Sequence, residues 1–390
     1  ALGGQRGRLP AGFRAADGAA TPVSAAPTGF EGLRIGLVGP LPPPAGGMAN
    51  QTRQLAELLR GAGADVHLVQ SNADYRPAFI GRVPVVRAGF RLLLFLGALW
   101  KAAGRSDLLH VMANSGWSWH LFAVPAIRVA RLRGVPVIVN YRGGEAEVFL
   151  DRAHAGVRRA LRQGTLLVVP SGFLQQVFAR HGMAAEVVPN IVDLERFQPA
   201  AASRPVAAHL VVARNLEPIY DNATAIRALA RVREARPDAR LTIAGSGPQD
   251  VELRRLAAEL GQTEAIRFAG RLDRDAVASL YQDADIALNP STVDNMPNSV
   301  LEALASGLPV VSTDVGGVPY IVQDGTTALL VPPRDPGAMA SAILRLLDNR
   351  DLANALSRAG LAEAQRYTWA RVAGVLACAY RRALALRDSA

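Results

Sequence analysis

Residues 289–309, NPSTVDNMPNSVLEALASGLP, are the stretch on which the interpretation of this sequence depends. The segment 295–298 is a poor helix former, whereas residues 299–305 favour a helix that begins at Ser299. The first amides of a helix lack partners and carry partial positive charge, so this helix start is a ready binding site for a diphosphate. Asp294 before the helix and Glu302 in its first turn can accept hydrogen bonds from hydroxyl groups of such a ligand. On spacing alone, a capped surface helix with two solvated carboxylates explains the stretch equally well.

On either side of this stretch, short apolar runs alternate with helical patterns, which is typical of parallel α/β sheets. In the first half, a strand at 33–38 leads through prolines and Gly46-Gly47 into a helix at 50–60 that Gly61 stops. We expect further strands at 66–69, 108–112, 135–140, 166–169 and 187–188, with helices at 120–132 and 172–180. In the second half we expect strands at 209–212, 241–244, 266–268, 286–288 and 309–312, with helices at 223–235, 251–260, 276–281 and 299–305.

A polar, proline-containing stretch at 193–205 separates the two arrays. The sequence therefore predicts the following division: a flexible lead-in at 1–30, a Rossmann-like domain at 31–200, a second Rossmann-like domain at 201–368, and a C-terminal helix at 369–390 that packs back across the junction. Open parallel sheets bind ligands beyond the carboxyl ends of their strands. With two doubly wound α/β sheets, the expected site is the cleft between them.

The composition is that of a globular protein, with 390 residues of which 50% are hydrophobic and 19% charged. The net charge of +10 comes almost wholly from arginine, because Lys101 is the only lysine. This charge reflects either a bias toward arginine codons or an attraction to anionic lipid, nucleotides or nucleic acid. A lone cysteine, Cys378, forms no internal disulfide and fits a reducing cytoplasmic compartment. The longest apolar run, at 92–100, is too short to span a membrane, and the first residues do not resemble a signal peptide.

Residues 294–302 resemble the acid-x7-Glu signature of retaining glycosyltransferase family 4, the large group with the GT-B fold. The matching words are SGPQD at 246–250, FAGRL at 268–272, VPNIVDLERF at 188–197 and EALASGLPVVSTDVGGVPYIV at 302–322. The likeness covers about residues 33–369. It implies two Rossmann-like domains facing across a cleft, and a hexosyltransferase that uses a nucleoside-diphosphate sugar.

The resemblance also implies roles for the residues of the signature. Glu302 would hold the nucleotide ribose and Asp294 would contact the donor sugar, although the family usually has glutamate at the position of Asp294. Gly270 and Arg271 of the FAGRL word would belong to the same donor site. The segment that would bind the sugar and diphosphate through its backbone comprises Asn295, Met296, Pro297, Asn298, Ser299 and Val300.

Two arginines are candidates for stabilising a leaving diphosphate. Arg214 follows the strand at 209–212 and can clamp a phosphate with two hydrogen bonds. The family often has a lysine six positions later, where this sequence has Tyr220, so the Tyr220 hydroxyl would have to contribute instead. Arg142 aligns with a histidine that lies near the reacting sugar in the family. Because arginine stays charged, Arg142 cannot act as a general base, but it can stabilise a leaving phosphate. For both arginines a purely structural role is the alternative.

Two glycine pairs complete the candidate donor site. Gly46-Gly47 opens the first helix and lets backbone approach a phosphate closely. Gly245 and Gly247 would let the nucleotide base lie against backbone. A plain turn explains either pair without a ligand. No histidine or acidic cluster has metal-ligand spacing, so we expect neither metal nor cofactor, and His110 is expected to be a satisfied core histidine.

Residues 82–105 combine Arg82, Arg87, Arg91, Lys101 and Arg105 with several apolar side chains. A basic helix of this kind can lie in an anionic membrane interface. A core helix flanked by charges is the alternative. The expected location is therefore cytoplasmic, with peripheral contact to the inner face of the cell membrane as an additional hypothesis.

The sequence thus predicts a retaining glycosyltransferase that uses a UDP or GDP sugar and an unidentified glycan or lipid-linked acceptor, in cell-surface polysaccharide or glycolipid synthesis. One alternative is a nucleotide-sugar epimerase of the same fold. A phosphorylase is disfavoured because its pyridoxal lysine would have to lie in the second domain, far from Lys101. A basic nucleic-acid-binding protein is also disfavoured, since aromatics make up only 6% of the chain and do not interleave with the charges.

Overall fold

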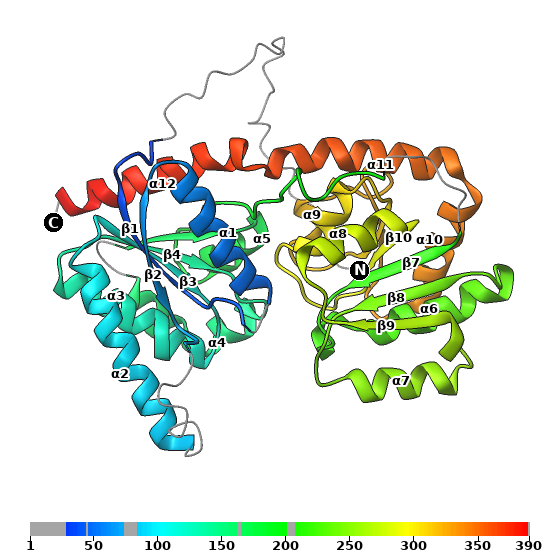
Figure 1. Ribbon diagram of the computed structural model, residues 1–390, viewed down its shortest axis with the longest axis horizontal. Helices are drawn as coiled ribbons and strands as arrows, with labels where there is room; N and C mark the ends of the chain where they lie inside the picture. The colour runs from blue at the N-terminus through cyan, green and yellow to red at the C-terminus, as the bar shows by residue number, and fades with distance from the viewer. Residues whose placement is uncertain (1–28, 44–45, 74–83, 162–164, 201–206, 389–390) are drawn as a thin grey trace, which may run out of the picture.

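The computed structural model describes residues 29–43, 46–73, 84–161, 165–200 and 207–388. In the two longest helices, the side chains are described from residue 92 onward in the first and up to residue 385 in the second. The predicted lead-in lies outside these residues except for its last two positions. In the described part of the chain, two six-stranded sheets lie side by side, each covered by helices on both faces (Figure 1). All strand pairs are parallel, which confirms the predicted fold class.

The first sheet has the strand order β2-β1-β3-β4-β5-β6. Its strands are β1 (Arg34–Gly39), β2 (Asp65–Gln70), β3 (Leu108–Ala113), β4 (Val137–Tyr141), β5 (Thr165–Val169) and β6 (Glu186–Val187). The helices between them are α1 (Gly47–Gly61), α2 (Pro84–Ala103), the π-helical turn η2 (Trp119–Ala123), α3 (Val124–Leu132), α4 (Ala146–Ala160) and α5 (Gly172–Arg180). Alternate strand residues face opposite sides, so that Leu109 packs toward α2 and α3 whereas Leu108 packs toward α1.

The second sheet has the strand order β12-β11-β10-β7-β8-β9. Its strands are β7 (His209–Ala213), β8 (Arg240–Ala244), β9 (Ile266–Gly270), β10 (Ile286–Asn289), β11 (Val310–Thr313) and β12 (Leu329–Val331). Its helices are α6 (Asn222–Ala235), α7 (Asp250–Glu259), α8 (Arg274–Asp283), α9 (Asn298–Ala305), α10 (Pro336–Asp348) and α11 (Arg350–Ala364). Helices α6, α7 and α10 cover one face, and α8 and α9 cover the other.

The strand orders locate the places where a ligand can bind. In the first sheet, successive strands are added on one side of β1 and then, from β3 on, on its other side, so the strand order reverses between β1 and β3. In the second sheet the strand order reverses in the same way between β7 and β10. A crevice opens at such a switch point, beyond the carboxyl ends of the two strands. Arg214 directly follows β7 and Asp294 follows β10, so both candidate residues lie at the switch point of the second sheet.

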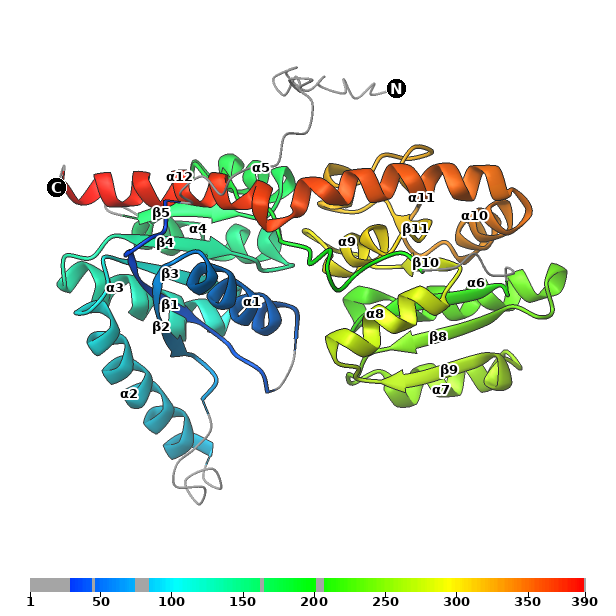
Figure 2. The same cartoon turned by 45° about the horizontal axis from the view of Figure 1, so that its top comes forward.

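The chain ends in a long helix, α12 (Trp369–Asp388), that leaves the second sheet through the 3-10 turn η6 (Gln365–Tyr367). Figure 2 shows α11 and α12 running along one side of the molecule, with α12 over the first sheet. Val372, Leu376 and Tyr380 of α12 are buried in the same core as α1, and Phe30 stacks on Trp369. The core of the first sheet is therefore completed by the last helix of the chain.

Several helices and strands differ from those that the sequence predicted. Helices α4, α10 and α11 and strand β12 were not expected, and α1 and α8 are longer than predicted. The segment predicted as one helix at 120–132 begins instead with a π-helical turn, followed by α3. These differences lie outside the strand ends that carry the candidate site, apart from the first turn of α1.

Candidate active site

The start of α9 is open, as a diphosphate site requires. Its N-cap residue is Pro297, which has no side-chain oxygen, and no side chain caps the helix. The amides of Asn298 and Ser299 have no acceptor among the residues that the structure describes. The helix begins at Asn298, one residue earlier than predicted, so Glu302 lies in its second turn rather than its first.

Not every amide of the predicted segment is available to a ligand. The amide of Asn295 donates to Oδ1 of Asp294 at 3.1 Å, and the amide of Val300 donates to the carbonyl of Pro297 at 3.2 Å. Pro297 has no N–H. The donor-binding role of this segment stays a prediction, and among the described residues its amides without an acceptor are those of Met296, Asn298 and Ser299.

The loop before α9 is held by two glycines that sequence reasoning had not singled out as structural. A Cβ on Gly316 would lie 2.1 Å from the carbonyl oxygen of Asp294, and one on Gly317 would lie 1.6 Å from that of Asn295. The amide of Gly317 donates to the carbonyl of Asp294 at 2.8 Å. Only glycine permits this approach of two backbones, which positions the carboxylate of Asp294.

Arg214 and Asp294 form an ion pair across the switch point of the second sheet. Nη2 of Arg214 lies 2.5 Å from Oδ2 of Asp294, and both side chains are almost fully buried. The guanidinium lies over the ring of Tyr220 at 3.9 Å and 3.5 Å from the hydroxyl of Ser299, while its buried Nε has no hydrogen-bond partner among the described residues. Burial raises the pKa of the Asp294 carboxyl, and the adjacent Arg214 opposes that shift. The pair thus offers an unused donor and a carboxylate beside the start of α9.

Glu302 is a half-buried carboxyl with three arginines near it. Burial raises its pKa to about 7, and the positive charges of Arg274, Arg214 and Arg196 oppose the shift. Sequence reasoning selected Arg271, whose side chain is exposed, and missed Arg274. Burial also lowers the pKa of Arg274, while Glu302 raises it. At neutral pH Glu302 is close to its midpoint, so a ligand that donates hydrogen bonds favours the carboxylate.

Gly245 and Gly247 lie so close to the backbone of a neighbouring loop that a larger residue would not fit. A Cβ on Gly245 would lie 1.9 Å from the carbonyl oxygen of Arg214, and one on Gly247 would lie 2.4 Å from that of Leu216. The amide of Gly245 donates to the carbonyl of Gly270, whose φ of 66° suits glycine. These glycines allow the close packing that holds the loop of Arg214 in place, and contact of this backbone with a nucleotide base stays a prediction.

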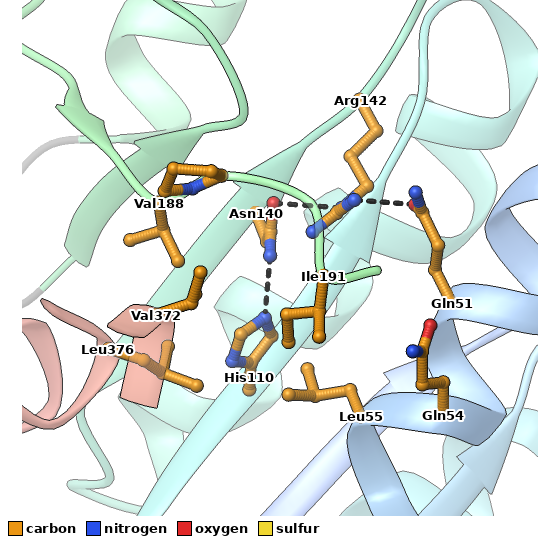
Figure 3. Close-up of a pocket in the computed structure, with 11 residues that line it drawn as sticks. Gln51, Gln54, Leu55, His110, Asn140, Arg142, Val188, Ile191, Val372 and Leu376 are labelled. Atoms are coloured by element: carbon orange, nitrogen blue, oxygen red, sulfur yellow. Dashed lines mark hydrogen bonds between the residues drawn. The ribbon is translucent and has the colours of Figure 1, made fainter. Parts of the chain in front are cut away.

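Arg142 follows β4 in the first sheet, and its backbone carbonyl accepts a hydrogen bond from the side-chain amide of Asn295 in the second at 3.3 Å. Its Nη1 donates to Oε1 of Gln51 at 2.5 Å and to Oδ1 of Asn190, and its Nε donates to Oδ1 of Asn140 at 3.1 Å. Figure 3 shows the guanidinium between Gln51 and Asn140. Burial lowers its pKa to about 10, so it remains a cation at neutral pH. No carboxylate of the described residues pairs with it.

Neutral amides join Arg142 to the start of α9. Gln51 and Asn190 each donate to Oδ1 of Asn298 at 2.8 Å, and Asn190 also donates to the carbonyl of Met296 at 2.9 Å. The side-chain amide of Asn295 donates to the carbonyl of Gly143 at 2.5 Å. Gln51 lies in the second turn of α1, so the structure brings the beginnings of α1 and α9 together.

Gly46 is the N-cap of α1 and Gly47 its first residue. A Cβ on either glycine would meet no atom within 4 Å among the described residues. The site therefore has open space next to the start of α1, on the side of the crevice opposite Arg214.

In the part of the chain that the structure describes, no group of three or more His, Cys, Asp or Glu side chains is arranged to hold a metal ion. None of the helices described there combines the length and the apolar character that a membrane span needs.

Two parallel six-stranded sheets, with the candidate residues at their strand ends, define the GT-B fold. The sucrose-phosphate synthase of Thermosynechococcus elongatus superposes with a TM-score of 0.70 at 22% identity, over 90% of this chain and 99% of that one. Anabaena HepE, in complex with UDP and glucose, gives a TM-score of 0.70 at 18% identity, over 90% and 100%.

The sequence comparisons define the family. Residues 45–196 match the model described as Glycosyltransferase Family 4, and residues 208–349 match Glycosyl transferases group 1. A glycogen synthase of Mycobacterium tuberculosis is 31% identical over 76% of this chain and 73% of its own. The D-inositol 3-phosphate glycosyltransferase of Saccharomonospora viridis is 33% identical over 80% and 78%. The chain belongs to glycosyltransferase family 4.

Proposed function

We propose that the protein is a retaining glycosyltransferase that moves a hexosyl group from a UDP or GDP sugar to a hydroxyl of a glycan or lipid-linked acceptor, in cell-surface polysaccharide or glycolipid synthesis. The observation that carries the proposal is the uncapped start of α9, which lies beside the Arg214–Asp294 pair and opposite Arg142. The relatives that act on inositol phosphate and phosphatidyl-myo-inositol support an acceptor hydroxyl.

The donor is held by groups of the second sheet. The amides of Asn298 and Ser299 and the free Nε of Arg214 bind the diphosphate, because they are donors without an acceptor of their own. The carboxylate of Glu302 accepts hydrogen bonds from the ribose hydroxyls, and Asp294 accepts from the sugar. The complex of HepE with UDP and glucose supports this type of donor. The donor is a substrate, and the proposed reaction needs no resident cofactor or metal.

The transfer itself exchanges one bond for another at the anomeric carbon. The bond from this carbon to the diphosphate oxygen breaks while the acceptor oxygen bonds to the same face, and the acceptor proton passes to the departing phosphate. Negative charge develops on the diphosphate, where the α9 amides, Arg214 and Arg142 stabilise it. Arg142 contributes because no carboxylate of the described residues pairs with its charge and its guanidinium is partly shielded from solvent.

A thermal-shift panel of UDP, GDP, ADP and their sugars tests the donor assignment. We expect one nucleotide series to raise the melting temperature, and Glu302→Ala to abolish that shift. A full response of the Glu302→Ala protein would contradict the ribose assignment.

The configuration of the product tests retention: with an α-linked donor, NMR should show an α-linked product. Release of UDP that does not depend on an acceptor would favour an epimerase.

We also propose that the first domain contacts an anionic membrane surface through α2 and the end of α3. Leu93, Leu94 and Trp100 of α2 and Leu132 of α3 are 69%, 52%, 46% and 75% exposed. The guanidinium of Arg133 lies over Trp100 at 4.7 Å, and Lys101 is exposed next to it. Apolar side chains bordered by cations fit an interface with anionic headgroups. Such contact would bring the enzyme to a lipid-linked acceptor.

A further inference from the structure

A chain of buried polar side chains leads from Arg142 into the core of the first domain. Nε of Arg142 donates to Oδ1 of Asn140 at 3.1 Å, Nδ2 of Asn140 lies 3.0 Å from Nε2 of His110, and Nδ1 of His110 lies 2.9 Å from the hydroxyl of Tyr380. Asn140, His110 and Tyr380 are at most 1% exposed. Figure 3 shows the first three, with Asn140 between Arg142 and His110.

The direction of each hydrogen bond follows from chemistry. Arginine can only donate, so the amide oxygen of Asn140 faces Arg142 and its NH2 group faces His110. Nε2 of His110 must then accept, which leaves the proton of the neutral imidazole on Nδ1, where it donates to Tyr380. Burial lowers the pKa of His110 to about 3, so the ring stays neutral at physiological pH. One arrangement of protons therefore satisfies the whole chain.

This arrangement determines which edge of Arg142 faces the crevice. With Nε occupied by Asn140 and Nη1 by Gln51 and Asn190, Nη2 has no acceptor among the described residues. A cavity of about 20 Å³ beside His110 and Arg142 has room for a single water and little else. The hydrogen bonds of Nε and Nη1 thus hold the guanidinium in one orientation.

A polar chain of this kind is costly for a protein core. An apolar set of side chains of the same volume would stabilise the domain as well or better, because buried polar groups must all be paired. Asn140 and His110 lie on adjacent strands, β4 and β3, and Tyr380 comes from α12 at the far end of the chain. Such supporting groups are typical of sites where a reactive group must keep one orientation.

We propose that Asn140 and His110 are positioning residues that fix the guanidinium of Arg142 toward the leaving diphosphate, with Asn140 setting the tautomer of His110 and Tyr380 of α12 accepting the hydrogen bond from its Nδ1. The inference rests on the proposed function, in which Arg142 stabilises the leaving group. Neither Asn140 nor His110 touches the donor. Their contribution is to hold Nη2 of Arg142 in the crevice, so their loss affects turnover rather than nucleotide affinity.

Steady-state kinetics of nucleoside-diphosphate release tests the inference on the full chain. We expect His110→Leu to lower kcat by about 10–100-fold with little change in the Kd for the nucleoside diphosphate. His110→Gln should recover most of kcat, since its amide can accept from Asn140 and donate to Tyr380. The matched control is His209→Leu, because His209 is also a buried, hydrogen-bonded histidine but begins β7 at the edge away from the site. It should lower the melting temperature and leave kcat unchanged.

The tautomer provides a readout that is independent of activity. NMR of ¹⁵N-labelled histidine should show His110 neutral, with its proton on Nδ1, from pH 5 to pH 8. In Asn140→Asp the carboxylate can only accept, so the proton should move to Nε2. A wild-type proton on Nε2, or titration of His110 within this range, would overturn the inference.

The kinetic outcomes separate this inference from the proposed function. If Arg142→Lys loses turnover while His110→Leu keeps wild-type kcat, the positioning role is wrong and the proposed function stands. If the wild-type chain releases no nucleoside diphosphate from any donor, the proposed function fails and the positioning role fails with it.

Discussion

At the scale of single residues, the site combines charges that the fold buries. The positions of Asp294, Arg214 and Ser299 were predictable because local sequence patterns mark the strand ends and the helix start at which these residues lie. Arg142 was predictable as a cation near the site. Its partners were not, since Gln51 is 91 residues away from Arg142 in sequence and lies within hydrogen-bond distance of it only in the folded chain.

Glu302 should make the protein less stable as the pH rises. Its pKa is about 7 in the folded chain, above the ordinary value of 4.5. Between these values the folded state binds more protons than the unfolded state, so stability falls as the pH rises from 4.5 to 7. We therefore expect Glu302→Gln to be more stable than the wild type at pH 8, by roughly 2 kcal/mol, and to differ little near pH 4.5. Urea unfolding at both pH values measures this.

The same substitution should weaken nucleotide binding, because a neutral amide accepts hydrogen bonds from ribose less strongly than a carboxylate does. Equal stability of the two proteins at pH 8 would show that Glu302 is not buried as a carboxylate. If Glu302→Gln made the protein more stable but left the nucleotide affinity unchanged, Glu302 would be a half-buried carboxylate that does not bind the ribose.

At the scale of elements, the decisive unit is the loop before α9 together with the helix start. The sequence predicted the helix within one residue, since its apolar face and preceding proline are local signals. The tight approach of Gly316 and Gly317 to this loop was not predictable, because it depends on a contact between two loops of the second domain. Helices α10 and α11 were missed although their caps, Asp335 and Asn349, are ordinary start signals.

Gly317→Ala should displace the loop that carries Asp294 and Asn295. The new Cβ would lie 1.6 Å from the carbonyl oxygen of Asn295, so the backbone has to move. We expect a lower melting temperature and nucleotide binding weakened by about tenfold or more, which corresponds to roughly 1.4 kcal/mol. Calorimetric titration measures the affinity.

The control is Gly156→Ala in α4, where a Cβ would meet no described atom. This exchange should stabilise the protein by roughly 0.5–1 kcal/mol, because alanine suits a helix interior better than glycine, and it should leave nucleotide binding intact. If Gly317→Ala behaved in the same way, the loop would not depend on that glycine.

Helix α2 provides a second test at this scale. The double substitution Leu93→Glu and Leu94→Glu should abolish co-sedimentation with vesicles that contain phosphatidylglycerol, because it replaces apolar contact with like charge. Binding by the wild type should weaken in high salt. Val251→Glu on α7, which is 79% exposed in the second domain, is the matched control and should bind as the wild type does. Wild-type binding that is equal on neutral phosphatidylcholine vesicles would contradict the role of the cations.

At the scale of the whole molecule, the two sheets depend on elements that cross between them. The alternation of strands and helices predicted two parallel α/β units, and the structure confirms that fold class. The proposed residue limits of the domains stay a prediction. The surface on which α12 packs could not be predicted from the sequence, because an apolar helix can pack on many surfaces. Only in the folded protein does it cover the face of the first sheet on which α1 lies.

Leu376→Ala should destabilise the first domain although the residue lies near the end of the chain. Leu376 is 1% exposed and packs in the core shared by α1 and α12. We expect a loss of about 2–4 kcal/mol, measured by chemical unfolding with a probe in the first domain. Val375→Ala, at a neighbouring position that is 43% exposed, should cost less than about 0.5 kcal/mol. Equal effects of the two exchanges would mean that α12 does not complete this core.

The most direct test of the proposed catalytic arrangement is a crystal structure of the protein with its preferred nucleoside diphosphate. We predict that the diphosphate oxygens lie within hydrogen-bond distance of the amides of Asn298 and Ser299, with the ribose hydroxyls on Glu302. A nucleotide bound elsewhere, with the first amides of α9 directed at other protein groups, would contradict the account.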